Sequence, residues 1–147
     1  MPARPPAVQT TTPHVDPPAV RLGEIQPGGL APAILAIVER GVRERPALAQ
    51  TFSAEVELSM EEHYPPVRIA FGERPVVVED GPSAAPDLRI SGSLADLVSL
   101  MVVPMVGGVP SPIRGRGRAA LSLVAQRRVK VEGRLALMRK FLSIIRV

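Results

Sequence analysis

A strict alternation of apolar and polar residues in TFSAEVELSM, residues 51–60, constrains the fold of this chain more than any other feature. The even positions, from Phe52 to Met60, are apolar, while the odd positions carry hydroxyl groups or the carboxylates of Glu55 and Glu57. Successive side chains of a strand point to opposite faces, so this period of two predicts a strand that is buried on one face. Such a strand needs neighbouring strands and a layer that covers its apolar face.

Four further segments predict the rest of a sheet of about five strands. They are residues 67–71, 74–81, 86–92 and 127–133. The breaks between the early segments, EEHYPP, GER and DGPSAAP, are rich in turn-forming residues. Because the GER break is too short for a crossover, it predicts antiparallel neighbours.

Residues 30–45 have the periodicity of an amphipathic helix. Its predicted buried side comprises Leu30, Ile34, Ile37, Val38 and Gly41. Pro46 predicts the end of this helix, because a proline disfavours helical geometry at the residue before it. We expect the ALAQ segment that follows to form a short turn.

A second helix is predicted from Ser93, which opens the tetrad SLAD. In such a capping box, Asp96 would reach back to the Ser93 amide. The predicted buried face of this helix consists of Leu94, Leu97, Val98 and Met101. Residues 104–117 are rich in glycine and proline and predict a long mobile loop, and residues 119–125 predict a short helix, with a strand as the alternative.

The last helix is predicted after Gly133, and its apolar residues cover an arc of about 180°. These residues are Leu135, Leu137, Met138, Phe141, Leu142, Ile144 and Ile145. The opposite side carries Arg139, Lys140, Ser143 and Arg146. An apolar arc of this width is broader than a single packing contact requires.

Charge is distributed unevenly along the chain, whose net charge is +4. Residues 29–113 carry six basic and eleven acidic side chains, whereas residues 114–147 carry ten basic and one acidic. The C-terminal quarter is therefore a basic patch that suits phosphates, anionic lipid or an acidic partner. The RGRGR tract at 114–118 has no aromatic residue to stack on bases, so nucleic acid is not the predicted partner.

Residues 1–28 contain seven prolines and little apolar periodicity, which predicts a disordered arm before a domain spanning residues 29–147. The chain has no cysteine, no apolar run long enough to span a membrane and no secretory leader at its start. We expect a soluble, cytoplasmic protein that associates with membranes peripherally.

Residues suited to catalysis or metal binding are scarce. His14 and His63 lack partners for a zinc site, and no phosphate-binding loop, dinucleotide fingerprint or nucleophile elbow occurs. The acidic pairs Glu61–Glu62 and Glu79–Asp80 lie at strand ends beside turns, where we expect them to be solvated. The sequence therefore predicts no metal, no cofactor and no enzyme activity.

Two segments, PDLRISGSLADLVSL at 86–100 and VKVEGRLALMRKFLSII at 129–145, resemble the sterol carrier protein type 2 (sterol-binding) domain family. The resemblance extends over about residues 30–147, with helices and strands in the same order. The chain departs from the family pattern at QRR, where a glycine is usual, at Arg134 and in its longer loop 102–117. Its last residues, IIRV, are not a peroxisomal signal.

The resemblance implies an α+β fold, in which helices cover one face of a twisted, mostly antiparallel sheet and enclose an apolar cavity or tunnel. The implied lipid-binding residues are Ile34, Ile37, Phe71, Leu97, Met101, Leu121, Val124, Leu137, Met138, Phe141 and Ile145. Arg139, Lys140 and Arg146 would dock on an anionic membrane. The alternative is an ordinary filled core, since the same aliphatic residues also suit close packing.

Three functions follow from these alternatives. The first is non-catalytic binding, and transfer, of an apolar lipid that is sterol-like, fatty acyl or an isoprenoid quinone. The second is an accessory role, in which the domain presents a lipid intermediate to lipid-processing enzymes such as those of quinone biosynthesis. The third is a protein-interaction or dimerisation domain with a filled core.

Overall fold

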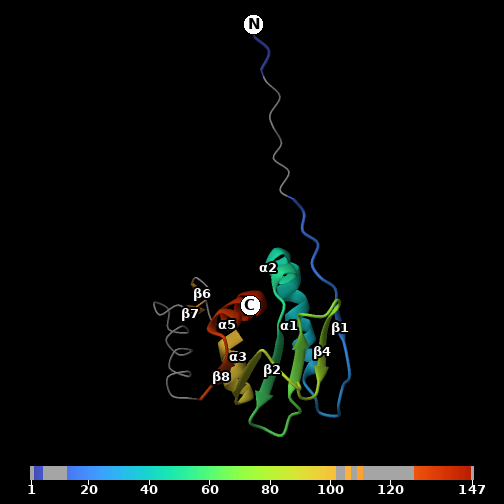
Figure 1. Cartoon of the computed structure of the whole chain (residues 1–147), viewed down its shortest axis with the longest axis vertical. Helices are drawn as coiled ribbons and strands as arrows, with labels where there is room; N and C mark the ends of the chain where they lie inside the picture. Colours follow the sequence, from blue (N-terminus) through green and yellow to red (C-terminus); the bar gives the residue numbers. More distant parts are fainter. Residues whose placement is uncertain (1, 5–12, 102–104, 107–108, 111–127, 147) are drawn as a thin grey trace.

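A six-stranded open sheet forms the centre of the fold in the computed structural model, which describes residues 2–4, 13–101, 105–106, 109–110 and 128–146 (Figure 1). Its strands are β1 (Val20–Leu22), β2 (Glu55–Met60), β3 (Val67–Ala70), β4 (Val76–Asp80), β5 (Leu88–Gly92) and β8 (Lys130–Gly133). Their order is β1-β4-β3-β2-β5-β8. The pairs β2–β3, β3–β4 and β5–β8 are antiparallel, which confirms the mostly antiparallel sheet and the GER turn, while β1–β4 and β2–β5 are parallel.

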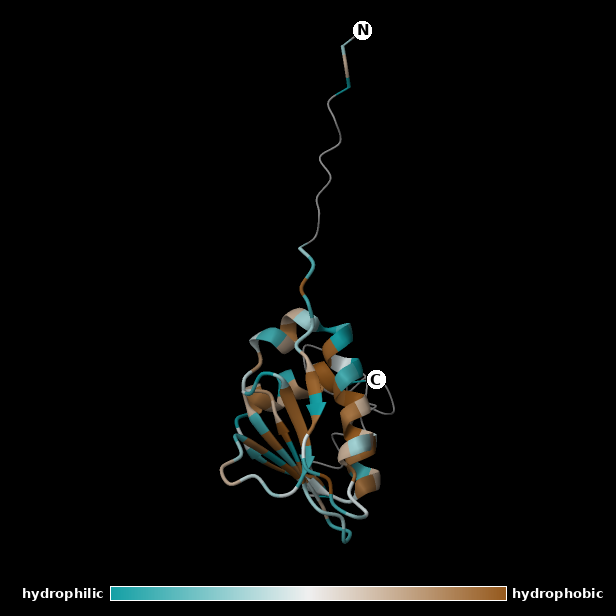
Figure 2. Cartoon of the chain, turned by 90° about the vertical axis from the view of Figure 1, so that its right-hand side faces the viewer, coloured by the Kyte–Doolittle hydropathy of each residue, from teal (hydrophilic) through white to brown (hydrophobic). Residues whose placement is uncertain are grey.

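The helices within the described residues gather on one side of this sheet (Figure 2). They are α1 (Ala31–Glu44), α2 (Pro46–Thr51), α3 (Leu94–Met101) and α5 (Leu135–Ile145). The apolar side chains of the strands face these helices, so that residues such as Val56, Ile69 and Ile90 are almost completely buried. The predicted α+β arrangement is confirmed.

Helices α1 and α5 cross in close contact at Gly41. A Cβ atom at this position would lie 2.1 Å from the backbone oxygen of Ile144. Arg45, just beyond α1, donates from Nη1 to the carbonyl oxygens of Ile144 at 3.3 Å and Arg146 at 3.4 Å. Burial, and then the charge of Arg146, lower the pKa of Arg45. The C-terminal ends of both helices are therefore held together.

Strand β1 lies within the segment predicted to be a disordered arm, and for residues 20–22 that prediction is wrong. The Val76 amide donates to the Ala19 oxygen at 2.8 Å, and the Gly23 amide donates to the Val78 oxygen at 2.8 Å. These bonds join backbone groups at the edge of the sheet, so they need no apolar periodicity in the added strand. The boundary between arm and domain elsewhere in 1–28 stays a prediction.

Two other segments differ from the predicted turn and loop. The ALAQ segment belongs to α2, because Pro46 occupies its first turn, where a missing amide proton costs nothing. Within the predicted loop 104–117, β6 (Met105–Val106) and β7 (Val109–Pro110) pair as a separate two-stranded sheet. The remainder of that loop, the RGRGR tract and the helix predicted at 119–125 lie outside the described residues.

The start of α3 is capped differently from the predicted capping box. The Asp96 amide donates to Ser93 Oγ at 3.1 Å, as a cap requires, but the Asp96 carboxylate accepts a hydrogen bond from Arg128 at 3.0 Å. The Leu94 amide donates to both carboxylate oxygens of Glu62, at 3.1 and 3.0 Å. The first amide of α3 is therefore capped by a glutamate distant in sequence, and the carboxylate of Asp96 pairs with Arg128.

The buried face of α3 is also rotated from the predicted one. Val98 is 46% exposed, so its assignment to the buried face is wrong, whereas Leu100 is buried. The buried arc runs through Leu97, Leu100 and Met101, because those side chains meet the core cluster.

Asp80 corrects the prediction that the Glu79–Asp80 pair is solvated, since it is only 3% exposed. Its carboxylate accepts hydrogen bonds from the amides of Gln26 at 2.9 Å and Ala31 at 3.0 Å. Ala31 is the first residue of α1, and Leu30 before it offers no capping side chain. Asp80 therefore caps α1 from the end of β4, where its charge also suits the positive end of the helix.

Candidate lipid-binding site

The structure brings together the predicted lipid-binding residues that it describes. Seven of them, Ile34, Phe71, Leu97, Met101, Met138, Phe141 and Ile145, belong to one hydrophobic cluster. Ile37 and Leu137 are half-buried and pack against it. Leu121 and Val124 lie outside the described residues. Residues from α1, α3 and α5, together with Phe71 just after β3, thus converge between the sheet and its helices.

An aromatic chain runs through this cluster. The ring of Phe71, just after β3, lies with its centroid 4.9 Å from that of Phe52 and 6.1 Å from that of Phe141, and both contacts are edge-to-face. This geometry is favourable for aromatic pairs. Phe52 was absent from the predicted set, although its place at the first even position of the alternating segment was a usable signal.

The side chains of the cluster are not all equally buried. Phe71 and Phe141 are almost inaccessible, while Ile34, Met101 and Met138 retain exposed fractions of 8%, 7% and 8%. Two surface depressions are lined by described residues, and both lie away from this cluster. One, of about 430 Å³, lies beside His14 and Arg43, and the other, of about 170 Å³, lies beside Glu55 and Arg68. The predicted apolar cavity stays a prediction.

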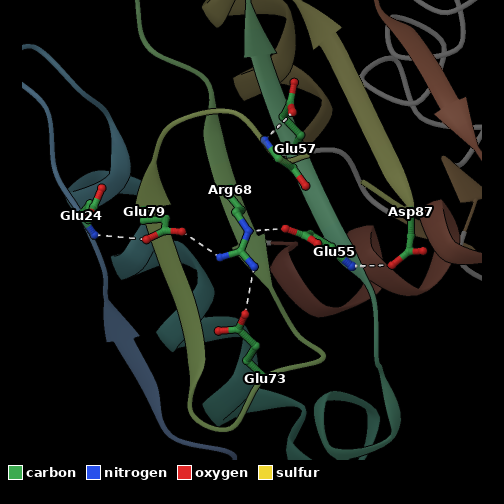
Figure 3. Close-up of polar contacts among 8 residues, drawn as sticks. Glu24, Glu55, Glu57, Arg68, Glu73, Glu79 and Asp87 are labelled. Carbon is green, nitrogen blue, oxygen red and sulfur yellow. Dashed lines mark hydrogen bonds and ion pairs between the residues drawn. The ribbon is translucent and has the colours of Figure 1, made fainter. Parts of the chain in front are cut away.

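The other face of the sheet carries a network of ion pairs centred on Arg68 (Figure 3). Its guanidinium donates to Glu79 at 2.7 Å, to Glu73 at 2.9 Å and to Glu55. Burial is the largest single influence and by itself would raise the pKa of Glu55, but the hydrogen bonds from Arg68 and Ser83 and the charge of Arg68 together outweigh it, so the pKa is lowered. The permanent charge of Arg68 therefore favours the ionised form of Glu55.

Glu57 lies on the same face and is only 5% exposed, so at this position β2 is buried on both faces and not on one face alone as predicted. It accepts hydrogen bonds from the Ser83 amide at 2.9 Å and from Arg89 Nε at 3.1 Å. The connection between β4 and β5, which contains Ser83, therefore covers this carboxylate. Among the residues that the structure describes, no group of three or more acidic or imidazole side chains is placed to hold a metal ion.

The predicted membrane-docking residues do not share one environment. Arg139 and Lys140 are exposed on α5, whereas Arg146 is half-buried beside Arg45. Within the described part of the chain, no helix has the length and hydrophobicity needed to cross a bilayer.

Comparison with known proteins gives matches by structure alone. No protein-family description and no curated protein matches the sequence. A UbiJ-SCP2 ubiquinone synthesis protein is similar with a TM-score of 0.54 and 14% identity, over 79% of this chain and 84% of that one. Sterol carrier protein 2 from Yarrowia lipolytica, in its apo form, is similar with a TM-score of 0.52 and 14% identity, over 80% of this chain and 91% of that one.

These similarities span most of both chains, and the order of helices and strands is the one that the two sequence segments led us to expect. The resemblance is therefore confirmed at the level of the fold: this chain has the fold of sterol carrier protein 2.

Proposed function

We propose that this protein binds an apolar lipid without catalysing a reaction, and holds it between the sheet and the helices α1, α3 and α5. The observation that carries the proposal is the convergence of all nine described lipid-binding candidates on one cluster, within a sterol carrier protein 2 fold. Apolar ligand sites are commonly built in this way, from hydrophobic side chains contributed by several elements.

The chemistry of the cluster favours a ligand whose buried part is apolar. The nine described candidates are aliphatic or aromatic residues and methionines. Burying a polar group without a hydrogen-bond partner costs about 2–7 kcal/mol, so a polar head group would stay near the surface. A sterol-like molecule, a fatty acyl chain and an isoprenoid quinone all meet this requirement.

Native mass spectrometry of the purified protein tests the proposal directly. We expect a mass increment that matches a co-purified lipid and disappears after extraction with organic solvent. Extracted protein should then take up a fluorescent fatty acid or sterol analogue. Absence of both the increment and the uptake would contradict the proposal.

Met101→Trp distinguishes a ligand chamber from a filled core. In a chamber, we expect the indole to occupy ligand volume, so that uptake of the fluorescent analogue falls while stability is nearly retained. In a filled core, overpacking costs about 1–3 kcal/mol. Val98→Trp on the same helix is the matched control, because Val98 is exposed and an indole there need not enter the cluster. Stability by urea unfolding and analogue uptake are measured on both variants.

Loss of stability in Met101→Trp, together with a wild-type protein that never takes up the analogue, would overturn the carrier proposal. It would favour the third function, a protein-interaction or dimerisation domain with a filled core.

An accessory role is the second candidate, and the likeness to a UbiJ-SCP2 ubiquinone synthesis protein favours it. In this role the domain would present a lipid intermediate to lipid-processing enzymes. An isoprenoid quinone precursor in the native mass spectrum would support this role, and a sterol or fatty acid would favour a carrier.

Docking on anionic membranes by Arg139 and Lys140 forms part of the proposal. Both side chains are exposed on α5, and each basic residue near an anionic surface contributes about 1 kcal/mol. We expect the double variant Arg139→Gln/Lys140→Gln to bind vesicles containing phosphatidylglycerol at least 10-fold more weakly, as measured by co-sedimentation.

The matched control for the docking test is Arg4→Gln/Arg21→Gln, which removes the same charge from two other exposed positions. Binding that is equal for both double variants, or that does not weaken with added salt, would contradict docking by α5.

A further inference from the structure

Two of the three large hydrophobic side chains exposed in the described residues lie on α3 and α5, helices that both contribute to the core cluster. Val98 on α3 is 46% exposed and Leu135 on α5 is 60% exposed. Each precedes a buried methionine by three residues, since Met101 follows Val98 and Met138 follows Leu135. Residues three apart share a helix face, so the buried apolar stripe of each helix continues onto the surface.

The topology places these two exposed positions toward the same end of the sheet. β5 and β8 are antiparallel neighbours, with Leu88 opposite Gly133. Helix α3 follows the end of β5, whereas α5 begins beside the start of β5, and both helices return over the same face (Figure 1). The last turn of α3 therefore lies toward the first turn of α5, with Met101 and Met138 in the core cluster beneath.

The charged side chains on α5 near these positions are positive, and Glu132, which precedes Arg134 by two residues, is paired with Arg89 and Lys130. Arg134 directly precedes Leu135, and Arg139 follows it by four residues, so it lies on the same side of the helix; both are exposed. Helix α5 contains no acidic residue, and the one acidic side chain of α3, Asp96, is paired with Arg128.

We infer that this α3–α5 surface, formed by Val98, Leu135, Arg134 and Arg139, inserts Val98 and Leu135 into the head-group region of an anionic lipid bilayer. The inference rests on the proposed function and adds that membrane contact is made directly above Met101 and Met138. Exposed aliphatic side chains beside arginines are the combination that binds at an anionic interface. A stable dimer normally buries about 800 Å² per partner, which two aliphatic side chains do not supply.

Tryptophan fluorescence provides the test, because the chain contains no tryptophan. In Leu135→Trp, the indole is a single reporter, and its emission should shift to shorter wavelength on phosphatidylglycerol-containing vesicles and be quenched by brominated acyl chains. Ile25→Trp is the matched control, since Ile25 is also 60% exposed but precedes α1; its emission should not change. Vesicle binding that leaves the Leu135→Trp emission unshifted would overturn the inference.

A second variant separates this inference from the proposed function. Val98→Gln/Leu135→Gln should bind anionic vesicles about 10-fold or more weakly. It should still take up a soluble fluorescent fatty acid, because both positions lie outside the buried cluster. If wild-type protein takes up no fatty acid but Leu135→Trp inserts, the proposed lipid binding fails and the membrane surface stands. Concentration-dependent dimerisation that this variant abolishes would instead assign the surface to a second copy of the chain.

Discussion

Gly41→Ala is expected to destabilise the protein by about 3 kcal/mol, the upper end of the cost of overpacking. The added methyl group would lie 2.1 Å from the backbone oxygen of Ile144, and a backbone atom cannot move aside as a flexible side chain can. Helices α1 and α5 would have to separate, and the Arg45 hydrogen bonds to the end of α5 would be lost with their contact. Urea unfolding followed by circular dichroism measures the change in free energy of unfolding.

The control for this variant is Ala36→Gly at an exposed position of α1. At this exposed position a protein with glycine should be less stable than one with alanine by about 1 kcal/mol, because glycine loses more backbone freedom on folding. The preference between alanine and glycine should therefore reverse between positions 36 and 41. A Gly41→Ala protein as stable as the wild type would show that the two helices do not cross at this distance.

Asp80→Ala is expected to lower the free energy of unfolding by about 3 kcal/mol. The substitution leaves the buried amide of Ala31 without its acceptor and also removes the acceptor of the Gln26 amide. Asp80→Asn should cost less, since its side-chain oxygen can still accept one hydrogen bond. Chemical unfolding of both variants, at a pH where the carboxylate is ionised in the wild type, measures the difference.

Glu61→Ala is the matched control, because Glu61 is an exposed carboxylate at the end of another strand. Its replacement should change stability by no more than about 0.5 kcal/mol. If Asp80→Ala and Glu61→Ala lower the free energy of unfolding by the same amount, Asp80 does not cap α1 from a distance.

Loss of the cap also bears on the proposed function. Helix α1 supplies Ile34 to the core cluster, and Ile34 lies in the first turn of that helix. A frayed first turn would therefore loosen one wall of the candidate site. Fatty-acid uptake and the free energy of unfolding are therefore both measured for Asp80→Asn. If uptake falls together with stability, the cap of α1 and the wall of the candidate site are coupled.

Periodicity in the sequence determined the strands and helices of the central fold. The alternation around Val56 identified β2 with its buried face, because a strand presents successive side chains to opposite sides whatever its neighbours are. Pro46 marked the end of α1 in the same local way. The wide apolar arc of α5 likewise placed Met138 and Phe141 in the core.

Only the tertiary structure decided the partners that come from distant parts of the chain. Strand β1 forms through backbone groups that all residues except proline carry in full, so its three residues show no distinctive pattern. Glu57 and Asp80 are buried because a loop and a helix start supply donors to them. Val98 is exposed because the helix turns a neighbouring arc to the core, and a helical wheel does not tell which arc that is. Periodicity reports the faces of one element, whereas contacts between elements depend on how the chain returns through space, and a single sequence does not record that.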